Sequence, residues 1–276
     1  MDIGGQALIE GVMIRSKEKI GIAVRKPSKE IITKILHPWS FSKKVSKIPF
    51  IRGIVMLIDT ILLGTRALLY SAKEQEEEGE KVSNTQIALS TIFSFILTIV
   101  LFILVPLVVS KWLTEDRIAF NILDGFLRIL IFLGYLWFIS LNKEIRRIFQ
   151  YHGAEHMSVH CYEANEQLTI KNVRKYSPIH PRCGTSFIII VIFISIIVFS
   201  FVWSDSLIIK LLQRILLIPI IAGLSYELLK VTAKHQKSKI MRILSSPGLW
   251  IQKITTKHPD DDQIEVAIAA VKTATN

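Results

Sequence analysis

Four long apolar runs constrain the fold of this chain more than any other feature of its sequence. A helix crosses a hydrocarbon core about 30 Å thick with about 20 mostly apolar residues. Soluble domains rarely contain such uninterrupted runs, and half of these 276 residues are hydrophobic. Short loops join the runs in pairs, so the sequence predicts a polytopic membrane bundle of two helical hairpins. The runs cover roughly residues 87–109, 118–141, 186–203 and 207–229, within hairpins 87–141 and 186–229.

A fifth apolar segment, residues 48–70, has a different pattern. Arg52, Asp59 and Arg66 recur in it at intervals of seven residues, which places them on one stripe of a helix. A polar stripe of this kind favours an amphipathic helix that lies in the membrane interface or is buried against the bundle. We therefore expect about four spans and one amphipathic helix.

The distribution of lysine and arginine predicts the orientation of the chain. Eleven lie in residues 1–53, seven in residues 142–184 and eight from Lys230 onward, whereas the loops 110–117 and 204–206 carry two and none. Because cytoplasmic loops carry the excess of basic residues, we expect both termini in the cytoplasm and the chain in the cytoplasmic membrane. The net charge of +11 then fits an anionic lipid surface. Since the basic residues lie between apolar runs, no nucleic-acid partner is expected.

The polar segments predict a small mixed α+β cap on the cytoplasmic side. In the N-terminal segment, residues 1–47, the alternating pattern of residues 18–36 around Pro27 is typical of a β-hairpin. The C-terminal tail, residues 230–276, contains a helix that starts with acidic residues and continues with an apolar face including Ile264. Only two cysteines occur, which argues against a disulfide scaffold. The expected fold class is mainly α, a membrane helical bundle with this cap.

The central polar loop, residues 142–184, contains the strongest chemical motif, YHGAEH. His152 and His156 lie on one face of a helix, about 6 Å apart along its axis, and two such imidazoles can share one zinc ion. Glu155 projects about 60° around the helix from His152 and can reach a water on the metal without ligating it. This is the inverted zinc-hydrolase arrangement, in which the carboxylate acts as general base.

A third ligand has to come from outside this helix. The segment HPRCGTSF offers His180 and Cys183, both competent zinc ligands, and Glu227 at the end of the last apolar run is another candidate. Arg182 lies in the same segment and can steady an oxyanion or a phosphate. The expected cofactor is zinc or another divalent metal.

Two further residues of the central loop belong to the same cluster. His160 can replace His152 as the partner of His156, whereas Glu163 lies about 10 Å beyond His156 and joins only if the helix breaks. The competing interpretation is a polar cluster at the membrane interface, with solvated histidines. Four of the seven histidines lie in this loop, which favours the metal site. Imidazole also titrates near neutrality, but the spacing gives no indication of a pH sensor.

The N-terminal segment GGQALIEGVMIR places glycines beside two charged residues. Gly4, Gly5 and Gly11 surround Glu10, and Arg15 ends the segment. The pattern is not that of a phosphate-binding loop, and no strand–glycine–helix unit follows it. The spacing favours tight turns beside a short strand over ligand binding.

Ionisable residues also occur inside the predicted spans. Asp124 and Arg128 lie one turn apart in the second run, and Lys210 and Arg214 lie one turn apart in the fourth. Such residues are costly in a membrane and indicate function by default. They can also snorkel to the surface or pair with each other. A cationic pocket for a lipid phosphate is the functional alternative.

Four segments in order, GGQALIEGVMIR, YHGAEH, HPRCGTSF and HPDDDQIEVAI, resemble the YqhQ-like family of prokaryotic multi-pass membrane proteins. The resemblance covers nearly the whole chain. It implies a membrane protein and a metal-dependent enzyme, and it implies no substrate. It also adds candidate site residues, which are Gly4, Gly5, Glu10, Gly11, Arg15, Glu163, Arg182, Asp260 and Glu265.

The sequence leads to two functional hypotheses. The first is a metal-dependent hydrolase at the cytoplasmic membrane interface, which acts on a lipid headgroup or on a peptide bond beside a span. The second is a non-catalytic membrane protein that binds lipid or assists transport or assembly, with a structural metal or none. Membrane lipids are the expected partners in both.

Overall fold

The computed structural model describes residues 3–38, 45, 47–76, 83–201, 204, 206–235 and 238–275. The end of the third apolar run, residues 202 and 203, and part of the N-terminal segment, residues 39–44 and 46, lie outside the described residues. The strands are β1 (Gly4–Leu8), β2 (Gly11–Arg15), β3 (Ile20–Arg25) and β4 (Ile31–Leu36). The helices are α2 (Ile51–Lys73), α3 (Asn84–Ile99), the π-helical turn η1 (Val100–Leu104), α4 (Val105–Leu113), α5 (Arg117–Ser140), α6 (Lys143–Glu163), α7 (Ile170–Val173), α8 (Gly184–Ser200), α9 (Leu207–Leu216), α10 (Ile218–Lys234), α11 (Lys239–Thr255) and α12 (Asp261–Thr275).

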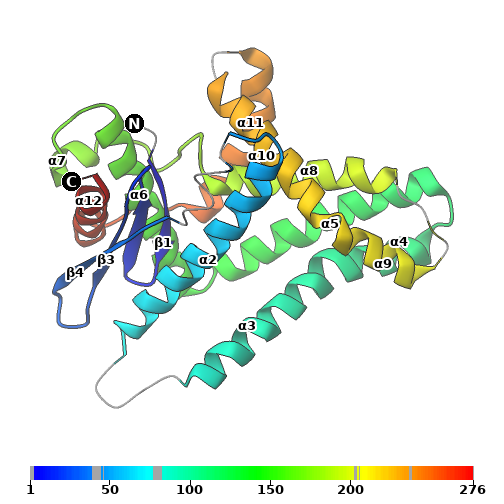
Figure 1. Ribbon diagram of the computed structural model, residues 1–276, viewed down its shortest axis with the longest axis horizontal. Helices are drawn as coiled ribbons and strands as arrows, with labels where there is room; N and C mark the ends of the chain where they lie inside the picture. The colour runs from blue at the N-terminus through cyan, green and yellow to red at the C-terminus, as the bar shows by residue number, and fades with distance from the viewer. Residues whose placement is uncertain are drawn as a thin grey trace.

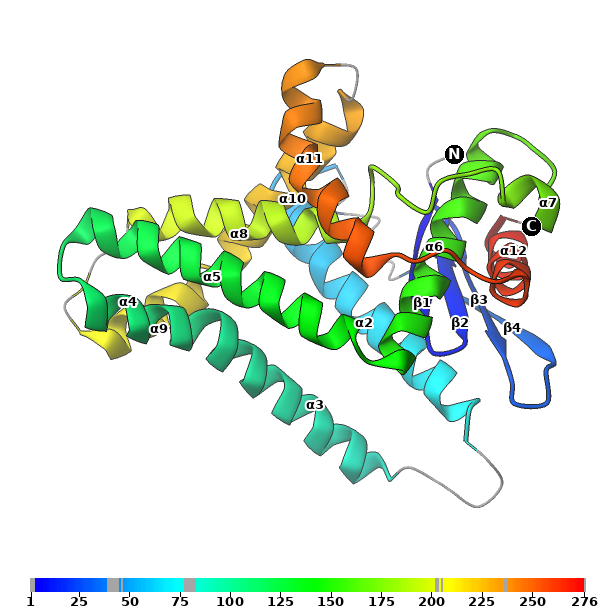
Figure 2. The ribbon, with the colours of Figure 1, turned by 180° about the vertical axis from the view of Figure 1, so that it is seen from behind.

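The sheet lies at one end of the molecule and α4 and α9 lie at the other, while α2 lies against the sheet (Figures 1 and 2). We call β1–β4 with α6, α7 and α12 the cap, and α3 to α5 with α8 to α10 the bundle. The loop between α4 and α5 lies at the end of the bundle farthest from the sheet, close to α9. α11 leads from the bundle back to the cap and continues into α12.

The cap contains an antiparallel sheet with strand order β1-β2-β3-β4 and a helix layer on each face. Because side chains alternate across a strand, β3 directs Ile20, Ile22 and Val24 to one face, where they join Leu63 and Ala67 of α2. The opposite face packs on α6 and α12. Covering on both faces explains why every residue of β3 is buried.

Helix α12 lies close against the sheet. Ile264, Ile268 and Val271, one apolar face of the helix, are all buried. Gly21 of β3 permits this approach, since a Cβ atom there would lie 2.6 Å from the carbonyl oxygen of Ala270. The hairpin of β3 and β4 and helix α12 therefore hold each other in place. The predicted class, mainly helical with a small sheet, is confirmed.

Three helices in the described part of the chain are long and apolar enough to cross a membrane: α2, the continuous stretch Thr85–Leu113, and α5. A fourth span results if α9 and α10, which are bent by 44°, are counted together. α8 is apolar but has only 17 residues. The apolar helices are typical of a membrane protein, while the number of spans stays open.

One predicted span differs from the structure in shape. The fourth run, residues 207–229, is divided at Leu217, because Pro219 begins a new helix and cannot continue the hydrogen bonding of the preceding one. The predicted amphipathic segment forms α2, and two residues of its charged stripe contact protein, whereas Arg66 is exposed. There Asp59 is buried and pairs with Arg15 of β2, and Arg52 pairs with Glu227 of α10.

Candidate metal centre

Helix α6 carries the YHGAEH motif through the centre of the cap. Its first turn is capped by Asn142, whose side-chain oxygen accepts the N–H of Glu144 at 2.8 Å. The helix is buried from Gly153 to Val159, where it packs against β1 and α12. The motif residues are thus held on a rigid element that is enclosed on two sides.

Both histidines of the motif are oriented by backbone carbonyls. Nδ1 of His152 lies 2.9 Å from the Thr255 oxygen, and Nδ1 of His156 lies 2.6 Å from the Pro178 oxygen. A neutral imidazole that donates Nδ1–H to a carbonyl keeps its lone pair on Nε2. Metal-binding histidines are oriented in this way in many proteins. Burial also lowers the pKa of His156 well below its usual value, so this ring is neutral.

Cys183 meets these two rings from the start of α8. Its Sγ lies 3.2 Å from Nε2 of His152, and the ligand atoms of His152, His156 and Cys183 all lie within 4.8 Å of one another. Two ligands of one tetrahedral zinc ion, at bond lengths of about 2.0–2.3 Å, are separated by roughly 3.3–3.6 Å. Burial raises the pKa of the Cys183 thiol. The three side chains have the chemistry and nearly the spacing of a zinc site.

Glu155 lies beside this group, and one of its oxygens has no hydrogen-bond partner among the described residues. Its side chain is buried, the N–H of Gly5 donates to the carboxylate, and Oε2 is left unsatisfied. Burial raises the pKa of Glu155 to about 7, while His152 opposes the shift. A buried, unsatisfied carboxylate oxygen is costly and indicates a ligand or a water that donates to it.

A cavity of about 50 Å³ connects these residues. A cavity volume of about 10–15 Å³ is enough for one water, so this cavity has room for an ion with a few waters. Its lining combines the two motif histidines with a strand, the loop after α7 and the start of α8. The lining residues are Ile3, Gly4, Gly5, His152, Glu155, His156, Val159, His180, Arg182, Cys183 and Gly184.

Two glycines allow the backbone to approach the centre. A Cβ on Gly153 would collide with the carbonyl oxygen of Lys257, and a Cβ on Gly5 would collide with that of Met13 and lie 3.1 Å from Cδ of Glu155. The Lys257 N–H donates to the Phe149 oxygen at 2.9 Å. Gly153 therefore lets the end of α11 and the residues after it lie on α6, where the carbonyl of Thr255, the last residue of α11, reaches His152.

Three of the other candidate ligands form a second group next to the first. The ligand atoms of His160, Glu163 and His180 also lie within 4.8 Å of one another. Nδ1 of His180 accepts the N–H of Arg182 at 3.2 Å, which leaves the ring proton on Nε2, 3.5 Å from Glu163 Oε2. Glu163 also pairs with Arg182. Since its Nε2 carries a proton toward Glu163, His180 is less suited than Cys183 to be the third ligand.

Burial lowers the pKa of His180 to about 4, so this ring is neutral as well. Gln252 of α11 fixes the backbone of His180. The His180 backbone N–H donates to Gln252 Oε1 at 2.8 Å, and Gln252 Nε2 donates to the His180 backbone oxygen at 3.0 Å. Nε2 of His160 donates to the Ile179 oxygen at 3.1 Å. Glu163, at the end of the unbroken α6, is grouped with His160 and His180 rather than with His156, because the 178–183 segment folds back to it.

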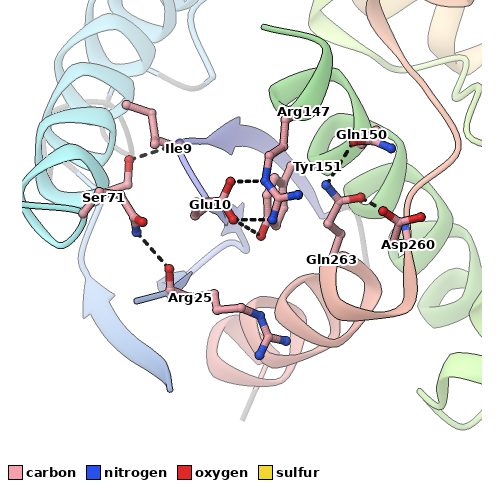
Figure 3. Close-up of polar contacts among 10 residues, drawn as sticks. Ile9, Glu10, Arg25, Ser71, Arg147, Gln150, Tyr151, Asp260 and Gln263 are labelled. Carbon is pink, nitrogen blue, oxygen red and sulfur yellow. Dashed lines mark hydrogen bonds and ion pairs between the residues drawn. The ribbon is translucent and has the colours of Figure 1, made fainter. Parts of the chain in front are cut away.

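Other predicted site residues lie away from this cavity. Glu10 pairs with Arg147 and accepts the Tyr151 hydroxyl at 3.1 Å, as Figure 3 shows. This contact ties the β1–β2 turn to α6, and Glu10 adopts a positive φ of 51° there. Of the three predicted glycines, Gly4 and Gly5 line the cavity and Gly11 does not.

The other candidates are engaged in contacts of their own. Glu227 was predicted as a third ligand, but its carboxylate pairs with Arg52 and accepts the Phe50 N–H at 3.0 Å. Arg15 pairs with Asp59 and Glu265 with Arg25. The N–H of Asp260 donates to Gln263 Oε1 at 2.9 Å, near the start of α12 (Figure 3). These contacts give the four residues structural roles in the cap and at its junction with the bundle.

Several residues that orient the site were not predicted. Thr255 and Pro178 act through backbone carbonyls, which any residue type provides, so their sequence carries no signal. Gly153 did carry a sequence signal. A glycine inside a helix costs about 1 kcal/mol relative to alanine, so its presence there indicates a packing reason. Gln252, a fully buried amide, was hidden in an amphipathic helix.

The fold and the site define a class: an apolar helical bundle whose small α+β cap encloses a histidine–cysteine–glutamate pocket. The chain belongs to the family described as "Protein of unknown function (DUF1385)", whose model matches residues 48–276. It is 36% identical over 286 residues to "Uncharacterized protein YqhQ" of Bacillus subtilis (strain 168), in an alignment that covers 96% of this chain and 89% of that relative. The resemblance noted in the sequence is thereby confirmed. No solved structure matches the chain.

Proposed function

We propose that the protein is a metal-dependent hydrolase and that the cavity between β1, α6 and the start of α8 is its active centre. The observation that carries the proposal is the buried Oε2 of Glu155, which has no hydrogen-bond partner in the described part of the chain and lies beside three potential zinc ligands. An unsatisfied carboxylate is expensive unless something in the cavity donates to it. A water held there satisfies it and is also the reactant of hydrolysis.

His152, His156 and Cys183 would hold the ion. A thiolate and two imidazoles favour zinc over magnesium or calcium, which prefer oxygen ligands. Three protein ligands with an open fourth position are typical of catalytic zinc sites. When bound, the ion would lower the pKa of water and polarise the bond to be cleaved.

Glu155 is the proposed general base. The Gly5 N–H donates a hydrogen bond to the carboxylate. Oε2 is then available to take a proton from a water in the cavity. A base works best with a pKa near the working pH, and burial brings the pKa of Glu155 to about 7. The neutral acid formed in this way can return the proton to the leaving group.

Arg182 is the proposed electrophilic residue. It lines the cavity and pairs with Glu163, so its guanidinium is held beside the site. A guanidinium can stabilise the negative charge that develops on an oxyanion or a phosphoryl oxygen. His180, through its contacts to Arg182 and Glu163, positions this group.

The substrate is proposed to be a lipid headgroup or a peptide bond next to a span, because the cap adjoins apolar helices. The excess of lysine and arginine in the segments that form the cap favours a cytoplasmic face. Membrane lipids are the proposed partners in either case. A site at this position reaches amphiphilic substrates without removing them from the bilayer.

The test is Glu155→Gln in purified full-length protein, assayed on phospholipid vesicles and on a fluorogenic peptide library. The expected result is a loss of hydrolysis of about 100-fold or more with unchanged zinc content. Glu166→Gln is the matched control, because Glu166 pairs with Lys175 and Tyr176 at the surface of the cap. Unchanged function in Glu155→Gln would contradict a catalytic role and favour a structural metal.

A further inference from the structure

A second polar site lies inside the bundle, at the end far from the cap. The carboxylate of Asp124 on α5 pairs with Arg128 of the same helix at 3.0 Å and with Arg214 of α9 at 2.7 Å. Arg128 also donates to the Ser195 hydroxyl of α8 at 2.9 Å. These three charged residues are 2–5% exposed. The contacts join three helices through one buried ionic network.

The network carries more positive than negative charge. Two guanidinium groups share one carboxylate, and among the described residues Asp124 is the acid that contacts them. Lys210, one turn before Arg214 on α9, adds an ammonium group 4.2 Å from the centre of the Phe120 ring. Removing a charge from water costs several kcal/mol, which a partner of opposite charge offsets. Two buried guanidinium groups that share one carboxylate among the described residues therefore favour binding of a further anion.

A small cavity is present at these residues. It measures about 10 Å³ and is lined by Phe120, Phe199, Lys210, Gln213 and Arg214. This volume is close to that of one water or one oxygen atom of an oxyanion. Among the residues that the structure describes, the buried Oε1 of Gln213 and the Nε of Arg128 have no hydrogen-bond partner. The amide of Gln213 can present its NH₂ to an anion after a 180° rotation.

The geometry of α9 explains why its cations face inward. A 44° bend separates α9 from α10. α9 has a buried cationic face and an exposed apolar face. Lys210 and Arg214 are buried, whereas Ile208 and Leu212 on the other side are 71% and 60% exposed. A broken helix in a membrane is tolerated where it lines a cavity or a binding site.

We propose that this pocket binds a phosphate-type oxyanion, either the headgroup of a membrane phospholipid or free phosphate. Guanidinium groups match the geometry of phosphate oxygens, and lysine adds a compact point charge. One oxygen of the anion enters the cavity and contacts Lys210 and Arg214, while the rest of the group lies at its mouth. The site is independent of the proposed metal centre, since none of the cavity residues belongs to the cap.

The test uses delipidated full-length protein in detergent. Inorganic phosphate is titrated while the thermal unfolding temperature is recorded, since a ligand of the folded state raises it. In parallel, native mass spectrometry of protein purified without delipidation counts the phospholipids retained per chain. Phosphate binding without retained lipid identifies a free anion, and one retained phospholipid identifies a headgroup. Either result supports the site if it depends on the cations.

Lys210→Met and Gln213→Leu test whether binding depends on the residues of the pocket. Both substitutions leave Arg128 and Arg214, the partners of Asp124, in place. We expect an at least tenfold weaker phosphate affinity, or loss of the retained lipid, in both variants. Lys111→Met, a lysine of α4 outside the cavity lining, is the matched control and should behave as the wild type. The proposal is overturned if the wild type binds neither ligand, or if Lys210→Met and Gln213→Leu bind as tightly as the wild type.

Discussion

The Sγ atom of Cys183 lies 3.2 Å from Nε2 of His152, although 31 residues separate them in the chain. The contact depends on α11, an element that neither residue belongs to. Thr255, the last residue of α11, holds the His152 ring through its carbonyl, and Gln252 of the same helix holds the backbone at His180, three residues before Cys183. Helix α11 therefore assembles both halves of the site.

Gly153→Ala tests the packing on which this assembly depends. The new methyl group would collide with the Lys257 carbonyl oxygen, so we expect a loss of about 1–3 kcal/mol in the free energy of unfolding. The His152–Thr255 contact would be lost with it, and zinc affinity should fall. Chemical denaturation and metal titration measure the two effects.

Gly134→Ala is the control for that substitution. Gly134 lies in α5, and a Cβ atom there has no other atom within 4 Å. Alanine should therefore be neutral or stabilise the helix by up to about 1 kcal/mol. If both alanines changed stability in the same direction and by the same amount, the proposed collision at Gly153 would be refuted.

Glu10→Gln tests how the sheet is fastened to α6. The carboxylate contacts Arg147 and the buried Tyr151 hydroxyl (Figure 3), and a charge-assisted hydrogen bond contributes about 1–3 kcal/mol. Because Arg147 is 46% exposed, we expect a loss at the lower end, about 1–2 kcal/mol. Asp261→Asn, which removes the exposed pair with Arg174, should cost less than about 1 kcal/mol. Equal costs would argue against a special role for Glu10.

The stability of metal-free protein should depend on pH through the buried histidines His156 and His180, whose pKa values are lowered, and through Glu155, which acts in the opposite direction. The folded-state pKa of His180 is lowered to about 4, so below pH 6.5 the unfolded chain binds more protons and stability falls as the pH falls to 4. The pKa of Glu155 is raised to about 7, so the folded state binds more protons between pH 4.5 and 7. Its contribution to stability is therefore present at low pH and is lost as the pH rises through this window.

Glu155→Gln separates the two contributions. It removes the group whose charging opposes folding, so the variant should gain stability relative to wild type as the pH rises from 4.5 to 7. The gain is on the order of 3 kcal/mol, from about 1.4 kcal/mol per unit of pKa shift. Urea unfolding at several pH values, in the presence of a chelator, measures it. A difference between variant and wild type that does not change with pH would contradict the raised pKa.

Local sequence patterns predicted the elements that depend on local physics. The i, i+4 spacing of His152 and His156 requires only a helix, and the alternating residues 18–36 require only a hairpin with a turn near Pro27. Both elements are present, as α6 and as β3 with β4. The apolar face at Ile264 likewise lies buried in α12.

What the sequence left open depends on contacts between distant segments. Whether Cys183, His180 or Glu227 approaches the motif is decided by Gln252, by the Thr255 carbonyl at the end of α11 and by the Arg52–Glu227 pair. The bend between α9 and α10 had a local signal in Pro219, but the apolar character of residues 207–229 concealed it.

The central claim is that His152, His156 and Cys183 bind one metal ion, and cobalt(II) substitution tests it most directly. The protein should bind one cobalt per chain with a sulfur-to-metal charge-transfer absorption, which Cys183→Ser abolishes and Cys161→Ser, in the core of the cap, preserves. His156→Ala should reduce the metal content to background. A wild type without bound metal, or an absorption that survives Cys183→Ser, would contradict the account.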